Sequence, residues 1–298
     1  MDVFKVQVSS QRKIPITQEN FTRETGEKPP YVASNDSGGK SFFAVCPECE
    51  NPIQIIGIYK NTPESGTTPY GRHYPKSVPK LAEYNHPDYL DCSYSNPKWK
   101  KGSLKRHHGS RVAQNTLRVL REQFDRVIYC LSKDVDMYIS YNTAEAMLRG
   151  YIANEGWLYR NATMNNLPWA FGEAESALPL FGRKIVRGSD LHHSLSENCP
   201  EVEFVDADKY VKVTSKQGEY IRLYYVLTNH RKEVTGEHLN ESIDLWVYRG
   251  SAPDIETVYH KTIQIRTEYF FNLINTSPEK SVRNEKYLEI AARLIPQT

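Results

Sequence analysis

The chain has 298 residues, of which 39% are hydrophobic and 25% charged, and this excludes a disordered or fibrous protein. Five cysteines, an odd number with no export signal, exclude a disulfide framework and favour a reducing compartment. The net charge of +2 excludes a uniformly basic protein, although six Lys and Arg residues fall between Lys98 and Arg111, where no acid occurs.

The first residues alternate between apolar and polar side chains over positions 3–8, which predicts a strand. They lack the basic head and apolar stretch of a secretory signal, and no apolar run reaches the roughly 20 residues of a membrane helix. We therefore expect a cytoplasmic protein with no membrane partner. Residues 9–40 are polar and interrupted by proline and glycine, which predicts an irregular lead-in.

Two apolar runs, residues 41–45 and 53–59, flank a Cys-X-X-Cys turn that contains Cys46 and Cys49. The runs predict the strands of a hairpin, which can supply half of a tetrahedral zinc site. Residues 60–110 are rich in Pro, Tyr, His and Lys, so something other than an apolar core must order them. Zinc binding can contribute roughly 10 to 16 kcal/mol to folding, which is sufficient for this purpose.

Cys92 is the next cysteine along the chain, and we expect it to be the third thiolate ligand. The expected fourth ligand is His73, whose turn-rich surroundings let the chain fold back onto the hairpin; His86 is the alternative. A closed Cys₃His set leaves no open coordination position, which predicts a structural zinc ion. A redox motif or two unligated thiols are the competing interpretations, but a redox pair normally opens a helix instead of joining two strands.

The run Phe-Ala-Val-Cys-Pro-Glu-Cys at 43–49, with Arg-His-Tyr at 72–74, resembles the N-terminal zinc ribbon of competence CoiA-like proteins. The family's aromatic-flanked histidine pair is represented here by His73 alone. The resemblance implies a bacterial nucleic-acid protein, from a mobile element or a defence locus, in a family that carries an attached nuclease-type domain. It implies Cys46, Cys49 and His73 as metal ligands and assigns no catalytic residue.

A cationic stretch follows the predicted zinc unit between residues 96 and 111. Lysine and arginine release condensed counterions from phosphates, and an indole can stack on an unpaired base, so this composition predicts contact with DNA or RNA. The alternative interpretation is a solvated linker whose charges maintain solubility. The predicted nucleic-acid-binding residues are Lys98, Trp99, Lys100, Lys101, Lys105 and Arg106.

The second part of the chain begins with helical periodicity. Apolar residues recur at three to five positions and predict helices over 111–130 and 144–153, and a third, shorter helix after Pro168. Residues 202–266 alternate as strands do, which predicts an antiparallel meander, and a helix over 282–294 closes the chain.

Within the meander, a turn at 216–219 is expected to pair residues 210–213 with a longer strand that starts at Tyr220. The predicted fold class is α+β, with a zinc-ribbon-like unit, a helical middle and a C-terminal antiparallel sheet with a closing helix. The predicted domains are a zinc-ribbon-like N-terminal domain with a basic linker (1–110) and an α+β C-terminal domain (111–298), helical over 111–185 and sheet plus helix over 200–298.

The sequence discloses no reaction, so whether the protein is an enzyme stays open. The leading hypothesis is a zinc-binding, nucleic-acid-associated protein; the second is a non-enzymatic assembly subunit whose Tyr-rich sheet binds another protein. The third is a metal-dependent nuclease, in which acids and a lysine must converge at strand ends. The residues available to such a nuclease are Glu203, Asp206, Asp208, Lys209, Asp244, Glu256 and Lys261.

Overall fold

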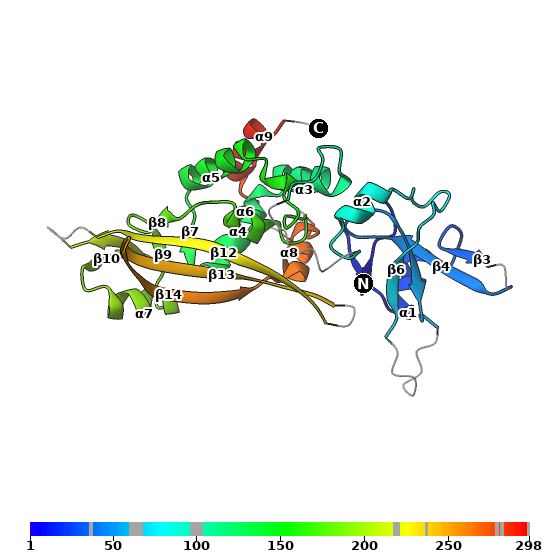
Figure 1. The fold of residues 1–298 in the computed structure, drawn as a ribbon, viewed down its shortest axis with the longest axis horizontal. Helices are drawn as coiled ribbons and strands as arrows, with labels where there is room; N and C mark the ends of the chain where they lie inside the picture. The colour runs from blue at the N-terminus through cyan, green and yellow to red at the C-terminus, as the bar shows by residue number, and fades with distance from the viewer. Residues whose placement is uncertain are drawn as a thin grey trace.

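The computed structural model describes residues 1–35, 38–59, 68–95, 104–216, 221–235, 238–277, 280 and 283–296. The fold is α+β, as predicted: small antiparallel sheets come first, helices form the middle, and a long antiparallel sheet is followed by closing helices. Figure 1 shows the N-terminal sheets at one end of an elongated molecule and the long sheet with its helices at the other. No helix in the described ranges is long and apolar enough to cross a bilayer.

The N-terminal part contains two antiparallel sheets. The first pairs β1 (Val3–Phe4) with β2 (Ile14–Pro15). The second has the strand order β3-β4-β5-β6, and all neighbouring strands in it are antiparallel. Its strands are β3 (Val32–Ser34), β4 (Lys40–Val45), β5 (Pro52–Ile56) and β6 (Tyr70–His73).

A short helix, α1 (Gln18–Thr25), lies in the stretch that we expected to be irregular, so that expectation is wrong. It begins after Thr17, whose side chain accepts a hydrogen bond from the Asn20 amide, and it ends at Gly26 in the left-handed conformation. Its one apolar residue, Phe21, is buried. One buried apolar residue in two turns gives no helical periodicity, which is why the sequence did not predict it.

The helical middle follows the prediction with one difference. The helix expected over 111–130 is divided into α3 (Arg111–Glu122) and α4 (Phe124–Asp134), because Gln123 leaves the helical region at φ −129° and ψ 22°. The next elements are α5 (Tyr141–Ala153) and the 3₁₀ turn η1 (Gly156–Leu158). The short helix expected after Pro168 is α6 (Leu167–Glu173).

The C-terminal strands form two sheets, not one meander. In one sheet the order is β10-β11-β9-β7, and in the other it is β14-β13-β12-β8. The strand at 210–213 therefore does not pair with the strand after residue 220, and the hairpin expected across 216–219 is wrong. The strands are β7 (Met137–Tyr138), β8 (Leu178–Pro179), β9 (Lys184–Val186), β10 (Val202–Ala207), β11 (Tyr210–Ser215), β12 (Leu223–Thr235), β13 (His238–Ser251) and β14 (Asp254–Gln264).

Helices cover one face of the long β12–β14 sheet. In Figure 1, α4 and α6 lie against it, and α6 packs on β12. The C-terminal helix α9 (Glu285–Leu294) packs on α3, α4 and α5, while α7 (Asp190–Asn198) packs on β14 and α8 (Thr267–Ile274) on α4. The large core beneath these helices has no residue in common with the core of the N-terminal sheets.

Candidate metal centre

The hairpin of β4 and β5 brings two cysteines to one end of the N-terminal sheet. Val45, the last residue of β4, pairs with Pro52, the first residue of β5, and Cys46 and Cys49 lie in the turn between them. A positive φ at Glu50 and a hydrogen bond from the Glu50 amide to the Cys46 carbonyl close this turn. Both sulfur atoms consequently lie beyond the same sheet edge.

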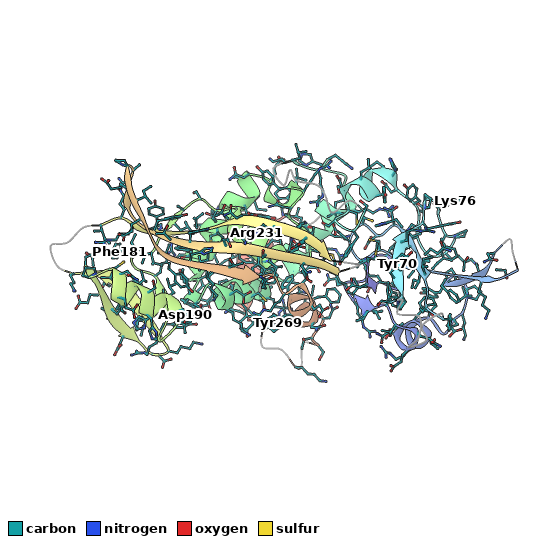
Figure 2. The ribbon with its side chains drawn as sticks, turned by 60° about the horizontal axis from the view of Figure 1, so that its bottom comes forward. Tyr70, Lys76, Phe181, Asp190, Arg231 and Tyr269 are labelled. Carbon is teal, nitrogen blue, oxygen red and sulfur yellow. The ribbon has the colours of Figure 1, made fainter. Side chains whose placement is uncertain are left out.

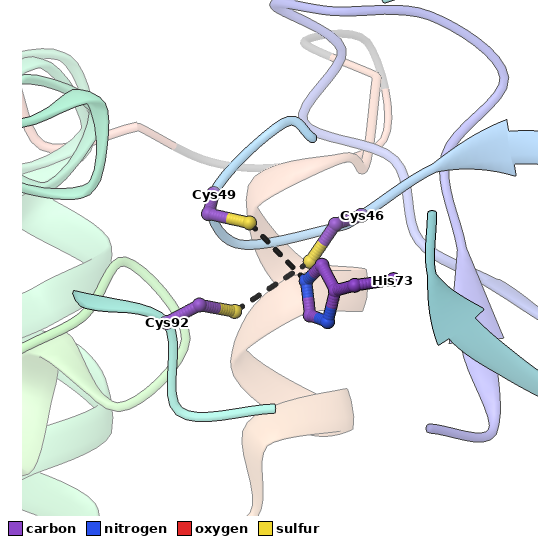
Figure 3. A group of neighbouring side chains, drawn as sticks. All are labelled: Cys46, Cys49, His73 and Cys92. Carbon is purple, nitrogen blue, oxygen red and sulfur yellow. Dashed lines mark hydrogen bonds between the residues drawn. The ribbon is translucent and has the colours of Figure 1, made fainter. Parts of the chain in front are cut away.

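The other two ligand candidates come from β6 and α2. Because β6 is antiparallel to β5, its last residue, His73, pairs with Ile53 and lies beside the cysteine turn. Cys92 follows α2 (His86–Asp91) as its C-cap residue. Figure 3 shows the three thiols and the imidazole directed toward one another from these separate segments.

The four side chains form a compact group. Their ligand atoms all lie within 4.8 Å of one another, and no other group of three or more His, Cys, Asp or Glu in the described ranges can hold a metal ion. Cys46 Sγ is 3.7 Å from Cys92 Sγ, and Cys49 Sγ is 3.3 Å from His73 Nε2. The three cysteines are buried and none forms a disulfide. This is a closed Cys₃His arrangement that can hold a metal ion.

The thiols influence one another strongly. Burial opposes ionisation, but hydrogen bonds from the other two thiols and the neighbouring imidazole lower the pKa of Cys46 well below its usual range. Burial raises the pKa values of Cys49 and Cys92 well above the usual range, and the adjacent Cys46 contributes to both increases. Once one of the three thiols is ionised, ionisation of the two thiols beside it is therefore unfavourable. A divalent cation would remove this conflict, because it stabilises every thiolate around it.

Buried polar residues hold the turn in place. The Asn51 side-chain amide donates to Cys49 Sγ at 3.2 Å, and its oxygen accepts a hydrogen bond from the Asn85 amide at 2.5 Å. Glu50 pairs with the fully buried Lys5 at 2.8 Å. Such outer contacts orient metal ligands. Sequence reasoning missed them, since an Asn two residues after a cysteine is unremarkable until its burial is known.

The structure selects between the two candidate histidines. His86 is the first residue of α2, where its ring stacks on Tyr89 and its Nδ1 lies 3.0 Å from the Tyr84 hydroxyl. It is not a member of the Cys₃His group, whereas His73 is. The prediction of His73 over His86 thus agrees with the geometry.

Of the six predicted nucleic-acid-binding residues, Lys98, Trp99, Lys100 and Lys101 lie outside the described residues. Lys105 is partly exposed and pairs with Glu155 at 2.9 Å. This ion pair leaves its ammonium group at the surface.

Arg106 has a different role from the one we predicted. Only 3% of the residue is exposed, and its guanidinium donates to the carbonyl oxygens of Tyr159 and Ala162, both at 2.7 Å, and of Arg160 at 2.9 Å. A guanidinium enclosed by three carbonyls is not available to a phosphate. We therefore remove Arg106 from the predicted nucleic-acid-binding set and regard it as a structural anchor.

The acids proposed for a nuclease are engaged elsewhere. Asp244 on β13 forms a two-pronged ion pair with Arg231 at 2.6 and 2.8 Å, and it also accepts a hydrogen bond from Thr262. Glu256 pairs with Arg249, and Asp206 belongs to the other C-terminal sheet. Among the described residues these acids do not converge, so the geometry offers no support for the nuclease hypothesis.

A chain of polar contacts, buried or partly buried, connects the candidate metal centre to the long sheet. Glu48, between the two cysteines of the turn, accepts a hydrogen bond from the Ser93 amide at 2.9 Å. The Ser93 hydroxyl accepts from Lys232 Nζ at 3.0 Å, and Lys232 lies 3.8 Å from Glu241. Glu241 in turn lies 2.6 Å from His230 Nε2. The cysteine turn and the tip of the β12–β13 hairpin are thereby linked side chain by side chain.

The fold and site thus define an α+β protein with a Cys₃His group that can hold a metal ion. Comparison of the chain with protein-family models, with curated proteins and with solved structures found no match.

Proposed function

We propose that the protein is a cytoplasmic, zinc-binding protein that associates with nucleic acid, and that its zinc ion is structural. The observation that supports zinc most directly is the spacing of the four ligand atoms. Zinc–sulfur bonds of about 2.3 Å in a tetrahedron place two sulfurs about 3.8 Å apart, and a sulfur and a nitrogen about 3.5 Å apart. Two of the six separations at this site, 3.7 and 3.3 Å, match those edges, and all six lie within 4.8 Å. Four protein ligands leave no position for a substrate.

Support for nucleic-acid association comes from the residues on both sides of the cationic segment. Cys92, a candidate ligand, lies shortly before Lys98, and the buried Arg106 lies shortly after Lys101. Both ends of the segment are therefore attached to the folded protein. The segment itself contains Lys98, Lys100 and Lys101 together with Trp99 and no acid, a composition that suits contact with a phosphate backbone.

The resemblance to competence CoiA-like proteins supports a bacterial origin, on a mobile element or in a defence locus, as part of the same proposal. It points to DNA or RNA as the partner in preference to a protein. The assembly-subunit hypothesis would be favoured instead if the purified protein carried a protein partner through high salt with no nucleic-acid absorbance.

Two measurements test the proposal. Metal analysis of the purified protein should give one zinc per chain, and Cys92→Ser should lose it. A Lys98/Lys100/Lys101→Ala variant should bind a labelled oligonucleotide more weakly and with a shallower salt dependence, the slope falling by about 0.7 to 0.9 for each phosphate that the variant no longer neutralises. A matched variant with the exposed Lys28, Lys76 and Lys212 changed to Ala should behave as wild type. Equal affinities for all three proteins at low salt would contradict the nucleic-acid proposal.

A further inference from the structure

The outer face of the long sheet carries a row of aromatic rings. Along β12 and β13 the side chains alternate: Leu223, Tyr225 and Leu227 enter the core, whereas Tyr224 faces the other way and pairs across the strands with Tyr248. Trp246, two residues before Tyr248, lies on the same outer face. In Figure 2 the strands of this sheet lie in front of the helices, so this face is not covered by them.

The rings follow one another across three strands. Tyr224 on β12 lies 5.6 Å from Tyr248 on β13, measured between ring centroids. Tyr248 lies 6.0 Å from Trp246 with the ring planes 5° apart, and Trp246 stacks on His260 of β14 at 3.8 Å. His260 retains 38% exposure of its side chain, and the other three rings are half-buried. We call these four residues the aromatic row.

The charges around the aromatic row suit a polyanion. The acid beside the rings, Asp244, is neutralised by Arg231 and lies 3.3 Å from His260 Nε2. An exposed arginine, Arg222, precedes Tyr224 by two residues. Aromatic surfaces of this kind on an open sheet, with a cation beside them, receive the unpaired bases of single-stranded nucleic acid, because every base has a π-face while duplex bases are already stacked.

We propose that the aromatic row is the binding site for the bases of a single-stranded nucleic acid, which stack on Trp246 and its neighbouring rings. The proposal rests on the proposed function and makes it more specific, because it assigns contact with the bases of the nucleic acid to this face of the sheet. It distinguishes this protein from one that holds the backbone of any nucleic acid by charge alone.

The experiment compares three labelled probes of equal length by fluorescence anisotropy: an oligothymidylate strand, a blunt duplex and an abasic deoxyribose phosphate oligomer. Wild type should prefer the oligothymidylate to both of the others. Trp246→Ala should weaken its binding by roughly 5- to 150-fold, the range expected for loss of one base stack. Trp246→Phe retains a ring and should restore most of the affinity, while Tyr129→Ala, at an exposed tyrosine on α4, should have no effect.

The outcomes separate the two proposals. If wild type binds all three probes equally and only the Lys98/Lys100/Lys101→Ala variant binds more weakly, the proposed function stands and the proposal that bases stack on the aromatic row is overturned. If wild type binds none of them, nucleic-acid association itself is overturned. Unchanged oligothymidylate affinity in Trp246→Ala overturns the stacking proposal directly. Thermal unfolding shows whether each variant is folded. If Trp246→Ala is unstable, the test is the quenching of indole fluorescence by oligothymidylate. This quenching should be smaller in Trp246→Phe than in wild type.

Discussion

Among single residues, Glu241 illustrates how a buried charge is retained in this protein. Burial alone would favour the neutral acid, but Lys232, His230 and a hydrogen bond from Asn166 lower the pKa of Glu241 to about 2. Asn166 Nδ2 donates to the carboxylate at 2.7 Å, and His230 Nε2 lies 2.6 Å from it. Removing one partner from such a network leaves a buried charge uncompensated, which is far more costly than the loss of a surface ion pair.

The low pKa of Glu241 makes stability depend on pH. An unfolded glutamate ionises near 4.5, so this carboxylate contributes its full stabilisation above pH 4.5 and loses it as the pH falls toward about 2. The contribution is about 3 kcal/mol. The free energy of unfolding, measured with urea, should therefore fall steeply between pH 5 and pH 2 in wild type and less steeply in Glu241→Gln. Glu203→Gln, at an exposed residue of β10, should keep the wild-type slope, and identical slopes in all three proteins would contradict this account.

At the scale of elements, the approach of α6 to the long sheet depends on a glycine. A methyl group added at Gly172 would lie 2.6 Å from Leu227 Cδ1 of β12 and 3.0 Å from Leu131 Cδ1 of α4. Both neighbours are buried and have little room to move. Gly150 in α5 offers a comparison, since a methyl group there would meet only the flexible end of Glu175, at 3.1 Å.

These two helical glycines should respond in opposite directions to the same substitution. Gly172→Ala should lower the free energy of unfolding by roughly 1 to 3 kcal/mol through overpacking. Gly150→Ala should be neutral or stabilising by up to about 1 kcal/mol, because alanine has the higher helix propensity. Chemical denaturation of both variants against wild type measures the difference. A Gly172→Ala protein as stable as Gly150→Ala would show that α6 does not pack as described.

For the whole molecule, the important feature is that the large core and the small core beside the Cys₃His group have different requirements. The large core contains most of the aliphatic and aromatic residues and no candidate metal ligand. The small core includes Cys46, Cys49 and Cys92 among its buried residues. We therefore expect the N-terminal sheets to depend on a metal ion in the Cys₃His group to a degree that the β12–β14 sheet and its helices do not.

Removal of metal should consequently affect the two ends of the molecule unequally. We expect a chelator to expose the three cysteines of the metal centre to a thiol reagent, while Cys130 and Cys199, buried in the large core, remain protected. Limited proteolysis under the same conditions should leave a resistant fragment that covers most of residues 111–298. Readdition of zinc should restore protection. Simultaneous exposure of all five cysteines would show that both cores unfold together.

Sequence reasoning succeeded where a short segment determines the chemistry. The Cys-X-X-Cys turn between two apolar runs and the scarcity of other ligands between residues 60 and 95 predicted the three cysteines and favoured His73 over His86 as the fourth ligand. The geometry places His73 in the Cys₃His group. The helices α3 to α6 and the closing helix α9 were predicted for the same reason, since helical periodicity is local, whereas α7 and α8 were not predicted. The α+β class follows from these elements and the alternating C-terminal pattern.

The failures concern partners that only the folded chain specifies. Alternation predicted that β11 and β12 are strands, but it carries no information on which strand each one joins, and they belong to different sheets. Arg106 was grouped with its basic neighbours by composition, although three carbonyl oxygens far along the chain enclose it. The aromatic row was equally inaccessible, because its rings come from three strands whose register cannot be read from residue types.

The separation of 46 positions between Cys46 and Cys92 has a consequence for chain topology. An ion held by both residues acts as a cross-link that closes a large loop, and a closure of this size is worth about 4 kcal/mol when estimated as for a disulfide. Unlike a disulfide, such a metal cross-link would persist under reducing conditions, and the concentration of free ion would control it. Residues within the loop, such as Ile53, Ile55 and Ile58, also belong to the small core, so the ion would add to their packing and not replace it.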